Sequence, residues 1–381
     1  MKPRIAVLGT YPPTQCGIAS FSQSLVNALV LLNAQVNVVR LVEDQEPRPS
    51  VAVVHQHMAG QAPGITANVI NHYDAVLVQH EYGIYGGPDG DEVLGLLDKI
   101  KVPKIVILHT VLPSPTRNQK LVMQGIIDAS DVLVTMTQTA KAYLLAGYDV
   151  QPQRIRVIPH GSADLRSQTT GLKRSLRPTI LTWGLISEGK GIEWGIEALA
   201  QLADLSPRPR YVVAGQTHPK VLLNEGERYR NSLQHIAASY GLSDDVIFVD
   251  KYLDAQSLRT LIQAADIVLL PYDSRDQVTS GVLVEAVVAG KPVVATKFPH
   301  ALEMLGDGSG ELVNQGDASD MAHAMRKILV DVKHAQSLRK KAAAKVHSLL
   351  WTSVGSDYLS LLDKLDTPRM ASTASSSRAV G

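Results

Sequence analysis

A lysine between two glycines is the first feature of this sequence that could do chemistry. Lys190 lies in "WGLISEGKG" (residues 183–191), after a strand-like run and before a helical pattern. An ammonium group and the free N–H groups of a helix N-terminus can together bind a diphosphate at such a point. The loop lacks the spacing and the Lys-Ser/Thr pair of a P-loop. On this motif alone, an ordinary surface turn is an equally good interpretation.

A carboxylate follows a later strand in a similar way. The stretch "PYDSRDQVTSGVLVEAVVAGKPVVAT" (residues 271–296) predicts a strand that ends at Pro271, a polar loop, and a helix that begins near Ser280 and Gly281. Glu285 lies about one turn into this helix. A carboxylate at that depth can accept two hydrogen bonds from a vicinal diol, as in a ribose. A carboxylate that only interacts with the helix dipole is the alternative.

The loop "TYPPTQCGIAS" (residues 10–20) joins the first predicted strand to the first predicted helix. Pro12 and Pro13 fix φ and remove backbone donors, and we expect Gly17 to let the backbone turn closely where the helix begins. A rigid loop before a helix N-terminus suits a phosphate or a sugar hydroxyl. From this loop alone, a tight turn without a ligand is the more economical interpretation.

Polar side chains follow a third strand in "HEYGIYGG" (residues 80–87). His80, Glu81 and Tyr82 are therefore candidates for binding an acceptor substrate, although a buried histidine with its hydrogen bonds satisfied is nearly as good an interpretation of His80. The following "DGD" (residues 89–91) resembles a metal-binding acidic pair, but its position favours a turn.

Two further groups could suggest a metal site or a nucleophile. "HQH" (residues 55–57) places two imidazoles on one face of a strand, but no third ligand is apparent, so we expect no metal. Cys16 has no visible activating partner in the sequence, which disfavours a nucleophilic role. As the single cysteine, it also excludes an internal disulfide and fits a reducing compartment.

The elements that must position these residues alternate in type along the chain. Short runs rich in Val, Ile and Leu read as buried parallel strands, because they are apolar throughout. The first set covers residues 4–9, 35–41, 75–80, 104–110, 132–137 and 154–159, and the second covers 179–184, 210–215, 246–250, 267–272 and 291–296. Two Rossmann-like α/β domains in succession are predicted, and ligands of such sheets bind beyond the carboxyl ends of the strands.

The predicted domain boundaries follow from this alternation. We expect an N-terminal Rossmann-like domain at residues 1–165, a linker at 166–178 and a C-terminal Rossmann-like domain at 179–345. A helix at 346–366 is expected to pack back on the N-terminal domain. The Ser-, Thr- and Ala-rich tail at 367–381 is expected to be disordered.

Composition narrows the class of protein. The 381 residues include 45% apolar residues, enough for two cores, and 37 Lys plus Arg balance 36 Asp plus Glu. This balance gives no reason to expect a nucleic-acid partner. The sequence shows neither an apolar signal region nor a run of membrane-spanning length, so a cytoplasmic location is expected, with peripheral membrane association left open.

Four motifs in register resemble one known family. "VIPHG" (residues 157–161), "WGLISEGKG" (183–191), "LIQAADIVLLPY" (261–272) and "GVLVEAVVAGKPVVAT" (281–296) together look like the GT-B retaining glycosyltransferases of family 4, also called group 1. The order and spacing match from "CGIASF" at residue 16 to the helix around residues 351–358. The resemblance implies two Rossmann-like domains that face each other across a cleft. The N-terminal domain would hold the acceptor, and the C-terminal domain would hold a nucleotide-sugar donor.

The resemblance also implies roles for single residues. Lys190 would neutralise the departing diphosphate, Glu285 would bind the ribose, and His109 of "ILHT" would lie by the donor sugar. Gly17 would bring backbone amides near the diphosphate and the acceptor. Together with Gly17, the donor-binding residues would be Gln277, Ser280, Gly281 and Val282.

Two positions depart from the family pattern. The first of the family's two glutamates falls on Gln277, which keeps hydrogen bonding but loses the charge. The arginine that often precedes the lysine loop falls on Leu185, and the loss of a charged hydrogen bond to phosphate typically costs on the order of 1.5–3 kcal/mol. Arg275 or Lys251 is a candidate to compensate.

The function implied is that of a retaining hexosyltransferase, which moves a hexose from a nucleotide diphosphate sugar to a hydroxyl acceptor, either a saccharide or lipid-linked. Lys190 and helix N-termini would stabilise the leaving group without a metal or other cofactor. The sequence shows no convincing carboxylate nucleophile, which favours front-side attack over a double displacement. A GT-B phosphorylase is the nearest enzymatic alternative. Leu185 and Gln277 also leave open a catalytically weak binding or scaffold protein.

Overall fold

The computed structural model describes residues 3–44, 47–166 and 175–375. The chain divides into two compact units. Unit 1 comprises Met1–Gly161 and Trp351–Gly381, and unit 2 comprises Ser162–Leu350. Most of the linker expected at 166–178 lies outside the described residues.

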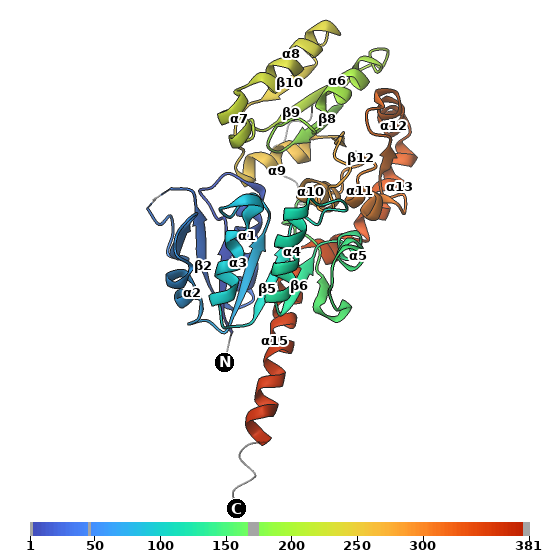
Figure 1. Cartoon of the computed structure of the whole chain (residues 1–381). Helices are drawn as coiled ribbons and strands as arrows, with labels where there is room; N and C mark the ends of the chain where they lie inside the picture. The colour runs from blue at the N-terminus through green and yellow to red at the C-terminus, as the bar shows by residue number, and fades with distance from the viewer. Residues whose placement is uncertain (1–2, 45–46, 167–174, 376–381) are drawn as a thin grey trace, which may run out of the picture. The chain divides into compact units, whose positions relative to one another are not determined.

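Within the described residues, unit 1 is built on a seven-stranded parallel sheet with strand order β3-β2-β1-β4-β5-β6-β7 (Figure 1). The central strands are apolar throughout because helices cover the sheet, and every residue of β4 is buried. The strands are β1 (Arg4–Gly9), β2 (Gln35–Val42), β3 (Val53–Met58), β4 (Ala75–His80), β5 (Lys104–Leu108), β6 (Val132–Thr135) and β7 (Ile155–Val157). The helices are α1 (Gly17–Leu31), α2 (Pro63–Ile70), α3 (Glu92–Lys99), α4 (Arg117–Ala129), α5 (Gln138–Gly147) and α15 (Trp351–Ser375).

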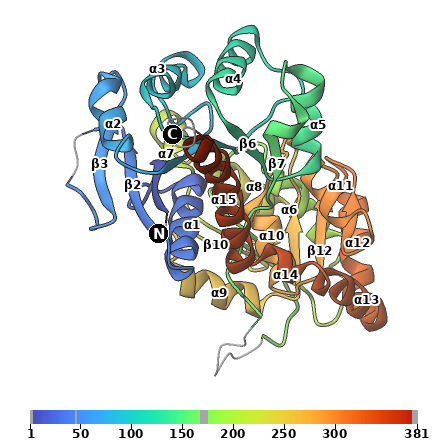
Figure 2. The same cartoon turned by 90° about the horizontal axis from the view of Figure 1, so that it is seen from below.

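The last helix completes the core of the first unit. Figure 2 shows α15 beside α1, and Val354 and Tyr358 of α15 are fully buried in the same apolar cluster as Phe21 and Leu25 of α1. The helix continues to Ser375, and so includes the beginning of the segment for which the sequence predicts disorder.

Unit 2 repeats the architecture with a six-stranded parallel sheet of order β10-β9-β8-β11-β12-β13. The strands are β8 (Thr179–Trp183), β9 (Arg210–Ala214), β10 (Val246–Val249), β11 (Ile267–Leu270), β12 (Val293–Thr296) and β13 (Glu311–Val313). The helices are α6 (Ile192–Ala200), α7 (Pro219–Glu225), α8 (Arg228–Ser239), α9 (Ala255–Ala264), α10 (Gly281–Val288), α11 (Pro299–Leu305), α12 (Ala318–Val330), α13 (Val332–Ala343) and α14 (Val346–Leu349).

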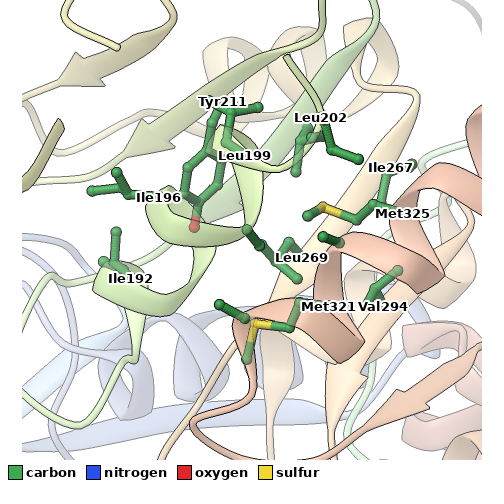
Figure 3. Packing of buried hydrophobic residues seen from close by; sticks show 14 of the residues in the cluster. Ile192, Ile196, Leu199, Leu202, Tyr211, Ile267, Leu269, Val294, Met321 and Met325 are labelled. Carbon is green, nitrogen blue, oxygen red and sulfur yellow. The ribbon is translucent and has the colours of Figure 1, made fainter. Parts of the chain in front are cut away.

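One core of unit 2 fixes the helix that follows the Lys190 loop. Figure 3 shows Ile192, Ile196 and Leu199 of α6 packed around Tyr211 of β9, with Met321 of α12 in the same cluster.

Every predicted strand is present, and most end one or two residues earlier than predicted. In each sheet the strand order reverses, between β1 and β4 in unit 1 and between β8 and β11 in unit 2. Ligands of α/β sheets bind at such reversal points.

The packing of α15 predicts that Tyr358→Ala destabilises unit 1. Loss of a fully buried aromatic ring typically costs about 3–5 kcal/mol, and the Tyr358 side chain is 0% exposed. Urea unfolding followed by circular dichroism measures the change, with the exposed neighbour Asp357→Ala as the control. An unchanged midpoint for Tyr358→Ala would show that α15 is not part of this core.

Candidate functional site

The loop that carries Lys190 is locked against the loop that follows β11. Gly191 begins α6 with φ +60°, and a Cβ at this position would lie 1.9 Å from the Pro271 carbonyl oxygen, so only glycine fits. The Asp273 N–H donates to the Gly189 carbonyl at 3.0 Å. Lys190 is therefore held where β8 and β11 lie side by side.

The Lys190 ammonium lies over an aromatic ring. Its Nζ is 4.5 Å from the centroid of Tyr272, the second residue after β11. Burial lowers the pKa of Lys190, because a charged ammonium is less stable away from water. Among the described residues, no carboxylate forms an ion pair with this ammonium. A cation held in this way can form a strong interaction with a bound anion.

Glu285 lies in the second turn of α10, as the sequence predicts. The indole N–H of Trp183, the last residue of β8, donates to Glu285 Oε2 at 3.0 Å. Burial raises the pKa of the Glu285 carboxyl, and the hydrogen bond from Trp183 partly offsets this rise. Burial raises the pKa of Tyr272, and the Glu285 carboxylate adds a smaller contribution in the same direction.

The predicted donor-binding residues form the N-terminal end of α10 and the loop before it. Ser280 caps the helix, since its side chain accepts from the Leu283 N–H at 3.3 Å. Gly281 and Val282 are the first helical residues and are partly exposed. Gln277 Nε2 donates to the Thr279 carbonyl at 3.2 Å.

A buried histidine that the sequence did not single out fixes this loop from behind. His300, at the start of α11, accepts from the Ser280 N–H at 2.8 Å through Nδ1. Its own backbone N–H donates to the Gln277 carbonyl at 3.2 Å. Neither contact has a sequence signal, because each joins residues at least twenty positions apart.

The arginine that Leu185 replaces in the family pattern has no clear substitute among the described residues. Arg228 of α8 pairs with Glu188, two residues before Lys190, at 3.2 Å, and also with Glu225. Two carboxylates thus balance its charge. Arg275 and Lys251, the candidates from the sequence, lie exposed on the loops after β11 and β10.

In unit 1, a buried arginine of β2 forms hydrogen bonds with the loop between β1 and α1. Arg40 of β2 is 1% exposed and donates from Nε to the Tyr11 carbonyl at 3.0 Å and from Nη2 to Thr14 Oγ1 at 2.9 Å. The loop is rigid, as Pro12 and Pro13 predict, but the expectation for Gly17 is wrong. Its backbone is not in the left-handed region, and a Cβ there would meet nothing within 4 Å. The glycine instead leaves space beside the helix N-terminus.

His109 follows β5 and is held by the neighbouring strand. Its Nε2 lies 2.7 Å from Gln79 Oε1, and its ring meets Phe21 edge-on at 4.8 Å. Gly9 makes room for Gln79, since a Cβ at Gly9 would lie 2.6 Å from Gln79 Cγ. Burial, with the charges of His160 and His80, lowers the pKa of His109 to about 3, so the ring is neutral near pH 7.

The acceptor candidates are less accessible than the sequence suggested. His80 is fully buried, neither ring nitrogen has a hydrogen-bond partner among the described residues, and burial lowers its pKa to about 3. Its ring packs edge-on against Tyr82, at 5.2 Å between centroids, and Tyr82 is 8% exposed. Glu81 is partly exposed between them. Of the three, Glu81 and Tyr82 retain some access to a ligand.

The other polar clusters are explained by local structure. His55 Nε2 and His57 Nδ1 both lie within 3.0 Å of Thr66 Oγ1. Residues 88–90 form a single 3-10 turn, and Asn118 donates to Asp89. A search of the described part of the chain found no group of three or more His, Cys, Asp or Glu side chains arranged to hold a metal ion. Over the same residues, no helix combines the length and the apolar character needed to cross a membrane.

Comparisons of the sequence identify a family for the second half of the chain. Residues 168–345 match the family of glycosyl transferases group 1. A D-inositol 3-phosphate glycosyltransferase of Corynebacterium jeikeium is 30% identical over 231 residues, which are 56% of this chain and 52% of that protein. The Paenarthrobacter aurescens protein of the same name is 26% identical over 343 residues, 81% of each chain. The chain spans about half the length of several curated relatives that it matches.

Solved structures share the fold. The sucrose-phosphate synthase of Thermosynechococcus elongatus superposes with a TM-score of 0.79 at 18% identity, over 96% of this chain and all of that one. Anabaena HepE, in complex with UDP and glucose, superposes with a TM-score of 0.74 at 15% identity, over 95% of this chain and all of that one. The predicted fold class, GT-B with two parallel-sheet α/β domains, is confirmed.

The structure gives Cys16 a capping role that can be tested. The thiol accepts from the Ala19 N–H at 3.3 Å at the start of α1. Cys16→Ser keeps an acceptor there, whereas Cys16→Ala removes it and should lower the free energy of unfolding by about 0.5–2 kcal/mol. Thermal unfolding of both variants measures the difference. Equal stability of the two variants would show that the thiol does not cap the helix.

Proposed function

Because residues 168–345 match the family of glycosyl transferases group 1, we propose that the protein is a retaining hexosyltransferase. It moves a hexose from a nucleotide diphosphate sugar to a hydroxyl group of a saccharide or a lipid-linked acceptor. Unit 2 binds the donor nucleotide, and unit 1 binds the acceptor.

One observation carries the donor half of this proposal. The Lys190 ammonium lies over the Tyr272 ring, and the half-buried Glu285 carboxylate interacts electrostatically with the same tyrosine. A nucleoside diphosphate carries the complementary pair of groups, an anionic diphosphate and a ribose diol. The ammonium suits the diphosphate and the carboxylate suits the diol.

Each group has a defined task in the transfer. The acceptor oxygen attacks the anomeric carbon from the face on which the diphosphate leaves, which retains the configuration. The bond from that carbon to the diphosphate oxygen breaks, and the acceptor proton passes to the departing phosphate. Lys190 and the N–H groups at the start of α10 stabilise the charge that develops on the diphosphate. In this scheme, the charge is neutralised without a metal ion.

The residues of unit 1 act as neutral hydrogen-bonding groups. His109 has a pKa of about 3 and hydrogen bonds with Gln79, so it serves as a neutral imidazole near the donor sugar. Glu81 and Tyr82 bind the acceptor, because His80 is buried and packs edge-on against the Tyr82 ring. A neutral His109 is consistent with a proton that goes to the phosphate and not to the protein.

The donor site is tested by thermal unfolding with UDP, GDP, ADP and inorganic phosphate. A ligand at a hundred times its dissociation constant should stabilise the protein by about 2.7 kcal/mol. We expect one nucleotide to raise the melting temperature of the wild type but not of Lys190→Ala. Lys340→Ala, an exposed lysine of α13 in the same unit, is the matched control and should respond as the wild type does.

Other outcomes would contradict the proposal in distinct ways. Stabilisation by inorganic phosphate alone would indicate the phosphorylase alternative. No response to any nucleotide would remove the donor site at Lys190 and Glu285 and favour a binding or scaffold role. An equal response of Lys190→Ala would place the nucleotide elsewhere.

Gly17 offers a second test, because its substitution should separate folding from binding. Gly17→Ala meets no atom in the protein and adds helix propensity at the start of α1, so stability should be unchanged or slightly higher. The added methyl group would occupy the space beside the helix N-terminus, so transfer from the donor should fall by about tenfold or more. Steady-state kinetics with the nucleotide sugar measures this. Full activity would show that the donor does not approach Gly17.

A further inference from the structure

The hydrogen bond between Trp183 and Glu285 joins two parts of unit 2 that are distant in sequence. Trp183 ends β8 and is 5% exposed, and its indole packs in the same apolar cluster as Val212 of β9 and Leu283 of α10. The packing fixes the ring, so the N–H has one direction in which to donate. It donates to Glu285 Oε2 at 3.0 Å.

The carboxylate is left with one oxygen for another partner. Within the described ranges, Glu285 Oε1 accepts no hydrogen bond, and the residue remains partly exposed. A buried carboxylate that accepts only one hydrogen bond keeps capacity for more.

We propose that Trp183 is a positioning residue for the donor. By holding Oε2, its indole N–H turns Oε1 toward the ribose hydroxyls and makes the site selective for ribonucleotides over nucleotides that lack those hydroxyls. This inference rests on the proposed function, in which Glu285 binds the ribose of the donor.

A free carboxylate on a short side chain could rotate about its last bonds and offer its oxygens in several directions. The indole N–H removes that freedom, so the hydroxyls meet an acceptor that is already oriented. The N–H also favours the ionised carboxylate over the protonated one, opposing the effect of burial on the Glu285 pKa. A protonated carboxyl would present a donor where the diol needs an acceptor.

The test compares UDP, GDP and ADP with their 2′,3′-dideoxy counterparts by calorimetry. For the nucleotide that binds, we expect the wild type to favour the ribose form by about tenfold or more, as hydrogen bonds to a charged group warrant. Trp183→Phe keeps an aromatic ring but removes the N–H. The variant should bind the ribose form more weakly and the dideoxy form almost unchanged, reducing the preference to about threefold or less.

Unit 2 provides a matched control. Trp194 donates from its indole N–H to Asp273 Oδ2 at 3.3 Å, so Trp194→Phe removes the same kind of bond without touching Glu285. It should leave the ribose preference as in the wild type, whatever it does to affinity. A preference that survives Trp183→Phe would overturn the inference. A wild type that binds no nucleotide would instead overturn the proposed function.

The pH dependence of nucleotide affinity separates loss of the hydrogen bond from loss of packing, because a packing defect alone would not shift it. Among the described residues, Tyr272 is the ionisable group that interacts electrostatically with the Glu285 carboxylate, and burial raises the pKa of Tyr272, which stays neutral in the acidic range. Affinity for the ribose form should therefore fall as pH drops through the Glu285 pKa. Without the N–H that pKa rises, so this loss should begin at higher pH in Trp183→Phe. If affinity for the ribose form begins to fall at the same pH in both proteins, the inference is contradicted.

A measurement on proteins that keep Trp183 covers the case in which Trp183→Phe does not fold. The chain has three tryptophans, so ¹⁵N–¹H spectra resolve three indole signals, which Trp194→Phe and Trp351→Phe assign by elimination. The Trp183 signal should shift as Glu285 titrates and should respond more to the ribonucleotide than to its dideoxy form. An identical response to both nucleotides would overturn the inference.

Discussion

A buried ammonium without a carboxylate partner among the described residues is the constraint on which the donor site depends. Lys190 would be more stable in water or beside an acid, yet its Nζ lies over the Tyr272 ring. A ring face provides only weak compensation, of the order of 1–2 kcal/mol. The rest of the loop must therefore hold the side chain in place, and under the proposed function the donor diphosphate would supply the missing interaction.

That rigidity comes from backbone contacts that tie two strand ends together. Gly191 lies against the Pro271 carbonyl, and Asp273 donates to Gly189, so the loops after β8 and β11 form one structure. Tyr272, between these contacts, is also stacked on Phe298, at 5.3 Å between ring centroids. The Tyr272 ring, over which the Lys190 ammonium lies, is thus fixed by contacts within the protein and needs no ligand to hold it.

The sequence predicted the strands well, because buried parallel strands follow from a local pattern. Apolar runs mark buried parallel strands, and a glycine-flanked lysine after such a run marks a strand end. The partners that orient those residues were not predictable in the same way. Trp183 is the first residue of the motif "WGLISEGKG" (residues 183–191), but its hydrogen bond reaches Glu285, 102 positions later. His300 and Arg40 likewise act through tertiary contacts that no local pattern encodes. The close backbone turn expected at Gly17 is absent, since its backbone is not in the left-handed region and does not require glycine.

The two departures from the family pattern have a physical relation that the sequence alone did not show. Leu185 removes a positive charge and Gln277 removes a negative one, so the formal charge of the donor site is unchanged by the pair. Arg228 does not alter this balance, because Glu188 and Glu225 neutralise it. A diphosphate in this site would therefore be stabilised by one buried ammonium and by backbone N–H groups. Such groups carry fixed dipoles and need no reorganisation as the leaving group gains charge. In the proposed donor site, the two departures would leave the stabilisation of the leaving group mainly to Lys190 and to the backbone.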